Sequence, residues 1–163
     1  MGDITNSFGR DTNTSLLNSM KILVVHRQKI TVDQIKSVLS SCNPVVLHTE
    51  SGLDGLLTSR IEHFDVIICG TDLPVVTGFE LVRSMRTNSI NRNTPVILIA
   101  GEVAGEPSGE TDKKTRYLGR ALGVEAILKR EEIGFKLLDV VHEQVRTEPD
   151  KKWSELLPVT RVG

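Results

Sequence analysis

Several features that would assign the chain to a particular class are scarce or missing. Its 163 residues include only two cysteines, Cys42 and Cys69, which excludes a disulfide framework and favours a reducing compartment, the cytoplasm. No apolar run approaches the roughly 20 residues that cross a bilayer, and the first twenty residues lack a basic and apolar leader. The net charge is only -1, which disfavours nucleic acid as a general partner. We therefore expect a cytoplasmic protein without membrane contact.

Motifs for metal, nucleotide or covalent chemistry are missing as well. The four histidines do not have the short spacings of metal sites, and the two cysteines are too far apart for a CxxC motif. Neither GxGxxG nor GxxxxGK[ST] occurs, so a phosphate-cradling loop has no support. We expect no enzyme activity, no metal and no cofactor.

What the chain does contain is a regular alternation of two hydrophobic periods. Five short apolar runs are typical of buried strands, and they cover residues 21–25, 45–47, 64–69, 95–100 and 124–128. Segments with helical spacing lie between and after them, near residues 30–39, 53–61, 79–85, 111–122 and 131–145. Each helix is expected to turn one apolar stripe inward, and in the second helix that stripe is Leu53, Leu56, Leu57 and Ile61. The alternation predicts an α/β, doubly wound (flavodoxin-like) five-stranded parallel sheet with helices on both faces.

Composition divides the chain into a core region and two extensions. Residues 1–20 are rich in Asn, Ser, Thr and Gly, which predicts a flexible arm. Residues 21–146 form the predicted domain, with an enlarged Gly- and Pro-containing loop at about 101–112. Residues 147–163 are expected to form a C-terminal extension.

In an open parallel sheet, ligands and catalysis belong at the carboxyl ends of the strands. Here His26 and Arg27 follow the first predicted strand, while Gly70 and Ala100 end the third and fourth. No acidic cluster forms, and neither Gly70 nor Ala100 carries a nucleophile.

Four segments of the chain, KILVVHR, DVIICGTDLPVVTGFEL, TPVILIAG and LGVEAILKRE, resemble the successive blocks of response-regulator receiver domains. The resemblance covers residues 21 to about 146. It implies an acidic pair after the first strand, a phosphoacceptor Asp at the end of the third, a Ser or Thr at the end of the fourth, a switch aromatic, and a Lys after the fifth. The corresponding positions hold His26 and Arg27, Gly70, Ala100, Ile127 and Arg130. The resemblance thus predicts a degenerate phosphorylation site, in other words a pseudo-receiver.

Two residues near these positions leave alternatives open. Placing Lys129 instead of Arg130 at the Lys position shifts the register by one residue and keeps that charge. Asp72 follows Gly70 by two positions, but no acidic partner after the first strand helps it to hold a metal. Neither alternative restores the acceptor.

Two surfaces are candidates for partner binding. A basic stripe on the predicted helix 111–122 consists of Lys113, Lys114, Arg116 and Arg120, with Tyr117 at its apolar border. The resemblance implies that this helix, the following strand and the last helix form a face for docking signalling proteins or for homodimerisation, although a solvated helix face is an equal alternative. Near the C-terminus, Trp153, Leu156 and Leu157 would group on one side of a short helix. They would either pack back or self-associate, or anchor a partner.

The sequence favours a phosphorylation-independent signalling protein of bacterial two-component signal transduction, which acts as an interaction module or adaptor. The alternative is a sensor that binds an anionic small molecule, such as a nucleotide messenger, in the degenerate crevice or on the basic helix. A conventional phosphorylated regulator is a third hypothesis, in which Asp72 would have to be the phosphoacceptor.

Overall fold

A computed structural model describes the backbone of residues 20–101 and 108–156, and the side chains of residues 20–101 and 112–144. Five parallel strands form one sheet in the order β2-β1-β3-β4-β5. Their bounds are β1 (Lys21–Val25), β2 (Val45–Thr49), β3 (Val66–Gly70), β4 (Val96–Ala100) and β5 (Ala126–Lys129). The order reverses direction after β2, which is the mark of a doubly wound sheet.

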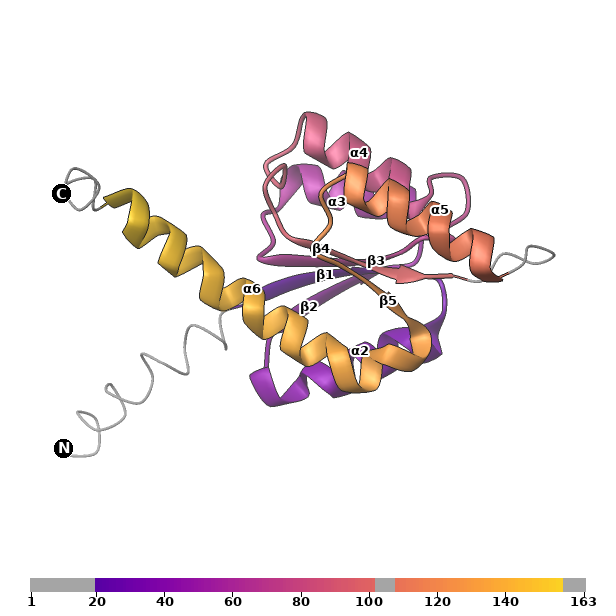
Figure 1. Cartoon of the computed structure of the whole chain (residues 1–163), viewed down its shortest axis with the longest axis horizontal. Helices are drawn as coiled ribbons and strands as arrows, with labels where there is room; N and C mark the ends of the chain where they lie inside the picture. The colour runs from indigo at the N-terminus through magenta and orange to yellow at the C-terminus, as the bar shows by residue number, and fades with distance from the viewer. Residues whose placement is uncertain (1–19, 102–107, 157–163) are drawn as a thin grey trace.

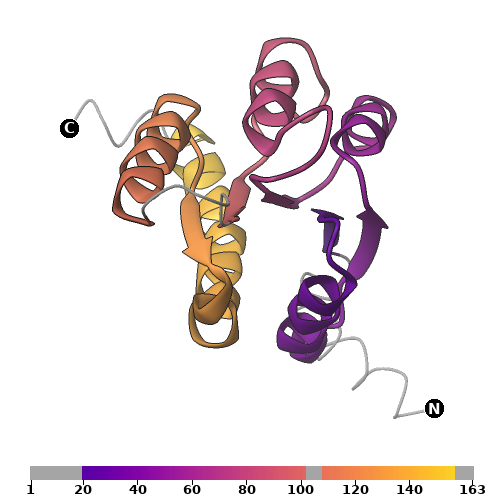
Figure 2. The ribbon, with the colours of Figure 1, turned by 90° about the vertical axis from the view of Figure 1, so that its right-hand side faces the viewer.

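Helices cover both faces of the sheet (Figure 1). On one face lie α2 (Lys29–Leu39) and α6 (Ile133–Leu156), which pack against each other. On the other face lie α3 (Gly52–Ile61), α4 (Gly78–Thr87) and α5 (Ser108–Ala121), and short 3-10 turns follow α2 and β5 at Ser40–Cys42 and Arg130–Glu132. Figure 2 shows the two helical layers from the side. The predicted α/β doubly wound architecture is confirmed.

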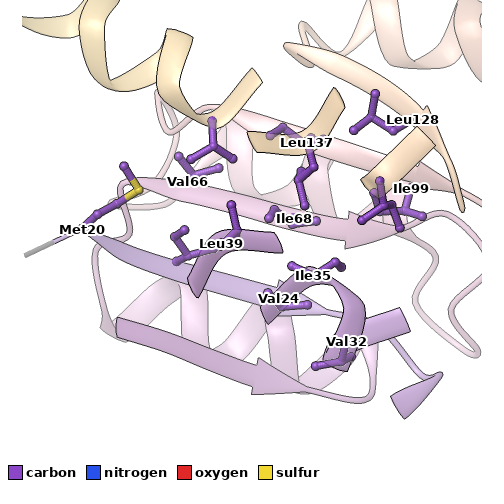
Figure 3. Close-up of a cluster of buried hydrophobic side chains, with 14 residues drawn as sticks. Met20, Val24, Val32, Ile35, Leu39, Val66, Ile68, Ile99, Leu128 and Leu137 are labelled. Atoms are coloured by element: carbon purple, nitrogen blue, oxygen red, sulfur yellow. The ribbon is translucent and has the colours of Figure 1, made fainter. Parts of the chain in front are cut away.

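The sheet divides the hydrophobic core into two layers. The layer beneath α2 and α6 contains Val24, Ile68 and Ile99 from the strands, with Ile35 and Leu137 from the helices (Figure 3). The opposite layer combines inward residues of the same strands with residues of α4 and the loop before it. Because parallel strands are buried on both faces, all five residues of β3 are buried, which explains why the strands read as continuous apolar runs.

The expected inward stripe of α3 is wrong in all but one residue. Leu56 is partly buried against the core, but Leu53, Leu57 and Ile61 are 49%, 52% and 83% exposed. The buried residues of α3 are instead the small ones, Gly52, Gly55 and Ser59. Apolar periodicity marks one face of a helix, but it cannot tell whether that face meets the core or the solvent.

The ends of the domain also differ from the sequence boundaries. Met20, assigned to the flexible arm, is 2% exposed in the core layer shown in Figure 3. The backbone of α6 continues without a break past residue 147, where the C-terminal extension was expected to begin, and includes Pro149. The rest of the arm lies outside the described residues, as do part of the expected loop at about 101–112 and Leu157. The side chains of Trp153 and Leu156 lie outside them too. No helix in the described ranges is both long and apolar enough to span a membrane.

Candidate functional site

The parallel sheet brings the residues that follow its strands to one edge. Strand register pairs Val25 with Cys69, Gly70 with Ile99, and Ala100 with Lys129. The segments after β1, β3, β4 and β5 therefore meet at the carboxyl edge, in what we call the crevice. His26, Gly70 and Ala100 all lie there.

The imidazole of His26 occupies the space beside Gly70. His26 is only 3% exposed. A Cβ atom placed on Gly70 would lie 2.9 Å from Cδ2 and 3.3 Å from Nε2 of His26, and 3.5 Å from Oδ1 of Asp72. Any side chain at position 70 would thus meet the ring, so the crevice is filled at the point where β3 ends.

Hydrogen bonds fix both the backbone and the ring of His26. The backbone N–H of Gln28 donates to Nδ1 of His26 over 3.0 Å. Nε2 of His48, on β2, is 2.9 Å from the carbonyl oxygen of His26, and since a carbonyl only accepts, His48 donates. Because Nδ1 of His26 accepts a hydrogen bond, the neutral ring carries its proton on Nε2.

The surroundings keep His26 neutral. Burial lowers the pKa of His26 from its ordinary value of 6.5, and the positive charges of Arg130 and Arg27 lower it further. The negative charge of Asp72 opposes this shift without cancelling it. A lowered pKa follows because a buried imidazolium next to two guanidinium groups would be poorly solvated.

The lowered pKa of His26 predicts that the free energy of unfolding decreases as the pH is lowered. Because the native pKa of His26 lies below 6.5, the unfolded chain binds a proton first as the pH falls. The contribution of neutral His26 to the free energy of unfolding is therefore complete above about pH 7 and declines below pH 6.5, by at most about 1.4 kcal/mol per pH unit. Chemical denaturation of the wild type and of His26→Asn, from about pH 7 to about pH 5, should show a flatter profile for the variant. Parallel profiles would contradict the shift.

Asp72 enters the crevice from the loop after β3. Its Oδ2 lies 3.3 Å from Nη2 of Arg27, while its Oδ1 is buried without a hydrogen-bond partner in the structure. The loop passes so close that a Cβ on Gly101 would lie 2.4 Å from Cγ of Asp72, so only glycine fits there. The sequence identified Asp72 as a neighbour of the crevice but gave no sign that Arg27 would pair with it.

Phosphoryl transfer at this edge would require a magnesium ion, and the residues present do not fit one. Magnesium requires oxygen ligands in near-octahedral geometry, and proteins usually hold it through one or two carboxylates together with substrate phosphates. Asp72 is a single carboxylate that already pairs with Arg27, and its neighbours are the imidazole of His26 and the bare backbone of Gly70. In the described part of the chain, no three acidic, His or Cys side chains gather around a point.

The two basic residues at the end of β5 interact with different groups. Nζ of Lys129 lies 3.1 Å from Oδ2 of Asp112 at the start of α5, whereas the charge of Arg130 acts on His26. Ile127 is half-buried under α5, where a Cβ on Gly119 would lie 2.5 Å from its Cδ1. The aliphatic side chain of Ile127 therefore packs directly beneath α5.

The basic residues of α5 form an open surface. Lys113, Lys114, Arg116 and Arg120 are exposed, and none of them pairs with a carboxylate in the described part of the chain. Tyr117 lies among them with 76% of its surface exposed, although the sequence placed it at an apolar border. We call these five residues the basic stripe.

Neither cysteine forms a disulfide. Burial raises the pKa of the Cys69 thiol far above its usual range, so Cys69 is an inert part of the core. Sγ of Cys42 lies 3.0 Å from Nε2 of His142 on α6. Sequence reasoning missed this contact because the two residues are separated by 100 positions.

Comparison with known proteins agrees with this geometry. The response regulator receiver domain family matches residues 22–111. The cell cycle transcriptional regulator CtrA of Caulobacter vibrioides is 28% identical over 97 residues, which are 60% of this chain and 38% of that protein. The cell cycle response regulator CtrA of Brucella ovis is 26% identical over 61% of this chain and 40% of its own length. The chain thus spans about two fifths of the length of these curated relatives.

Solved structures show the same fold. Chemotaxis response regulator CheY4 of Vibrio cholerae superposes with a TM-score of 0.60 at 24% identity, over 75% of this chain and 98% of that one. The receiver domain of a histidine kinase from Syntrophus aciditrophicus gives a TM-score of 0.66 at 18% identity, over 80% and 92%. The chain belongs to the response regulator receiver domain family, the signalling domains of bacterial two-component systems.

Proposed function

We propose that this chain is a pseudo-receiver, a signalling protein that acts without aspartyl phosphorylation and without enzyme activity, as a protein interaction module or adaptor. One observation carries the proposal: β3 ends in Gly70, and the imidazole of His26 fills the space that a side chain there would need. A phosphoacceptor at the end of β3 requires a nucleophilic oxygen and carboxylates that hold a metal beside it. Gly70 has no such oxygen, and the neighbouring carboxylate of Asp72 is paired with Arg27.

The proposal assigns recognition to the α5-β5-α6 face. The cations of the basic stripe lie on α5, and helix α6 packs against β5 on the same edge of the sheet. Surface cations without an ion-pair partner contribute little to the stability of their own domain. They increase the rate and the specificity of association with an acidic surface on another protein. An acidic surface on a cytoplasmic signalling protein is the matching partner.

Charge reversal on the basic stripe is the test. Affinity capture from the native cells, with the double variant Arg116→Glu and Arg120→Glu, is expected to retain at least about tenfold less partner than the wild type. The matched control reverses Lys29 and Lys36, two exposed cations on α2. Retention that falls equally in both double variants, or in neither, would contradict docking on α5.

The second candidate is a sensor for an anionic small molecule. The observation that favours it is the pair of guanidinium groups, Arg27 and Arg130, near the buried imidazole of His26. A ligand that binds only the native state raises the unfolding temperature. Stabilisation of the wild type by nucleotides, lost in Arg130→Gln, would favour the sensor over the adaptor.

A further inference from the structure

Three arginines line a hollow between the ends of α4 and α5. The hollow has a volume of about 550 Å³, which is within the range of small-molecule sites. Arg83 and Arg86 come from the last turns of α4, and Arg92 comes from the loop before β4. Because the other walls are formed by residues 121–123 and 125, which lead into β5, the hollow lies at the amino edge of the sheet, opposite the crevice. We call it the arginine pocket.

Hydrogen bonds hold the guanidinium group of Arg86 in place. Its Nη1 donates to the carbonyl oxygens of Arg92 and Thr94 over 2.9 and 2.7 Å, and its Nε donates to the carbonyl oxygen of Leu122 over 3.4 Å. No hydrogen bond within the described residues uses Nη2 of Arg86, and this atom is not buried. Its two N–H groups are therefore available to a ligand, on a side chain that is already ordered.

Partial burial makes this cation a favourable site for an anion. Burial lowers the pKa of Arg86 from its ordinary value, and the negative charge of Glu125 opposes the shift. The shift arises because a half-buried guanidinium has lost part of its hydration. A bound anion can replace the lost water with charge-assisted hydrogen bonds, which are stronger than those between neutral groups.

Positive charge dominates the lining of the arginine pocket. Arg83 and Arg92 are exposed, and neither forms an ion pair within the described residues. A second hollow of about 850 Å³ adjoins the pocket, because it shares Arg92 and also includes Arg60. Among the described residues, the two hollows are lined by four arginines and a single acidic residue, Glu125. The surplus of three positive charges indicates an anionic ligand.

We propose that the arginine pocket binds an oligophosphate anion, in which two or more phosphate groups are linked. The planar guanidinium group matches phosphate oxygens with parallel N–H donors, so arginine is well suited to phosphate recognition. A single phosphate group carries roughly 1.5 to 2 negative charges, which balances only part of the surplus, whereas linked phosphates balance more of it. Free oligophosphate and the phosphate chain of a nucleotide share this chemistry. The pocket lies at the opposite edge of the sheet from the crevice, so this inference is independent of the sensor hypothesis above.

Isothermal titration calorimetry of the whole chain with inorganic tripolyphosphate tests the site. The wild type is expected to bind, and the double variant Arg83→Gln and Arg92→Gln is expected to raise the Kd at least about tenfold, because it removes two charge-assisted contacts. Both side chains are exposed, whereas Arg86 joins three segments of the fold, so the double variant spares the residue that the structure needs. Thermal unfolding shows whether the variant is folded.

A gain of affinity gives a second readout. Glu125→Gln removes the only negative charge from the lining among the described residues and is expected to lower the Kd at least about twofold. The matched control, Arg116→Gln with Arg120→Gln, removes the same charge from the basic stripe and should leave the Kd within about twofold of the wild type.

Three results would overturn the arginine pocket as an anion site. The first is a wild type that does not bind tripolyphosphate. The second is an equal loss of affinity in the two double variants, which would show attraction by overall charge alone. The third is binding that Arg130→Gln abolishes and the pocket variant leaves intact, which would place the anion in the crevice.

A parallel titration with ATP in the absence of magnesium distinguishes the two sources of oligophosphate. Equal Kd values for ATP and tripolyphosphate, both raised in the pocket variant, would show that the phosphate chain alone is recognised. A Kd for ATP that is at least about fivefold lower would identify a nucleotide, with its apolar part in the adjoining hollow, where Ile90 is 54% exposed. Ile90→Ser should then remove the difference. Binding of tripolyphosphate without binding of ATP would restrict the ligand to free oligophosphate.

Discussion

Replacing Asn91 with alanine is expected to lower the free energy of unfolding by roughly 3–5 kcal/mol, a large loss for one residue outside the helices and strands. Asn91 is fully buried, and its amide uses both ends. Its Oδ1 accepts hydrogen bonds from the backbone N–H of Phe64 over 2.8 Å and from the hydroxyl of Thr94 over 3.0 Å. Its Nδ2 donates to the carbonyl oxygens of Ser59 and Glu62, at 2.5 and 2.8 Å.

The size of the effect follows from what alanine leaves behind. A buried backbone group without a partner costs about 1–3 kcal/mol, and alanine at position 91 would leave several such groups around a new cavity. These groups belong to the end of α3 and the segment before β3, so the same substitution loosens the end of this helix. Urea denaturation monitored by circular dichroism measures the loss.

Two further variants make the expectation specific. Asn91→Asp keeps the shape and the accepting oxygen but turns a second oxygen toward two carbonyl groups, so it should destabilise at least as much as alanine. Asn93→Ala changes an exposed neighbour and should shift the free energy of unfolding by less than about 0.5 kcal/mol. An aspartate variant as stable as the wild type would show that the donated hydrogen bonds contribute little.

Restoring the acceptor alone is not expected to restore phosphorylation. Gly70→Asp should gain no phosphoryl group on incubation with magnesium and acetyl phosphate, because its Cβ would press against the ring of His26 and no acidic pair would hold the metal. It should also lower the free energy of unfolding by about 1–3 kcal/mol through crowding and repulsion from Asp72. The combined variant His26→Asp, Arg27→Asp and Gly70→Asp removes the ring and supplies three carboxylates, so it is expected to become phosphorylated.

Intact mass spectrometry after incubation measures whether the wild type and each variant gain a phosphoryl group. The wild type should show no gain, and Asp72→Asn serves as the control for a phosphoryl group on the loop aspartate. A gain in the wild type that disappears in Asp72→Asn would overturn phosphorylation-independent signalling. A gain in Gly70→Asp alone would show that the imidazole does not block the crevice.

Local patterns in the sequence predicted much of the fold. The strands are buried on both faces and the helices on one, so two hydrophobic periods were enough to give the order of the elements and the parallel sheet. The same rule placed His26, Gly70 and Ala100 at one edge, because the carboxyl ends of parallel strands meet there. These features depend on residue types and on spacing along the chain, which a sequence displays directly.

Tertiary structure decided the features that depend on distance. Helix α3 faces the domain with its small residues because Gly52 and Gly55 approach neighbouring segments closely. Hydrophobic periodicity alone predicted that the opposite, leucine-rich side of the helix is buried. The pairing of Arg27 with Asp72 joins residues 45 positions apart, and Asn91 reaches up to 32 positions back. Composition determined which side chains were available for the crevice. Close packing determined which of them meet, because steric fit and hydrogen-bond geometry act between segments that the sequence separates.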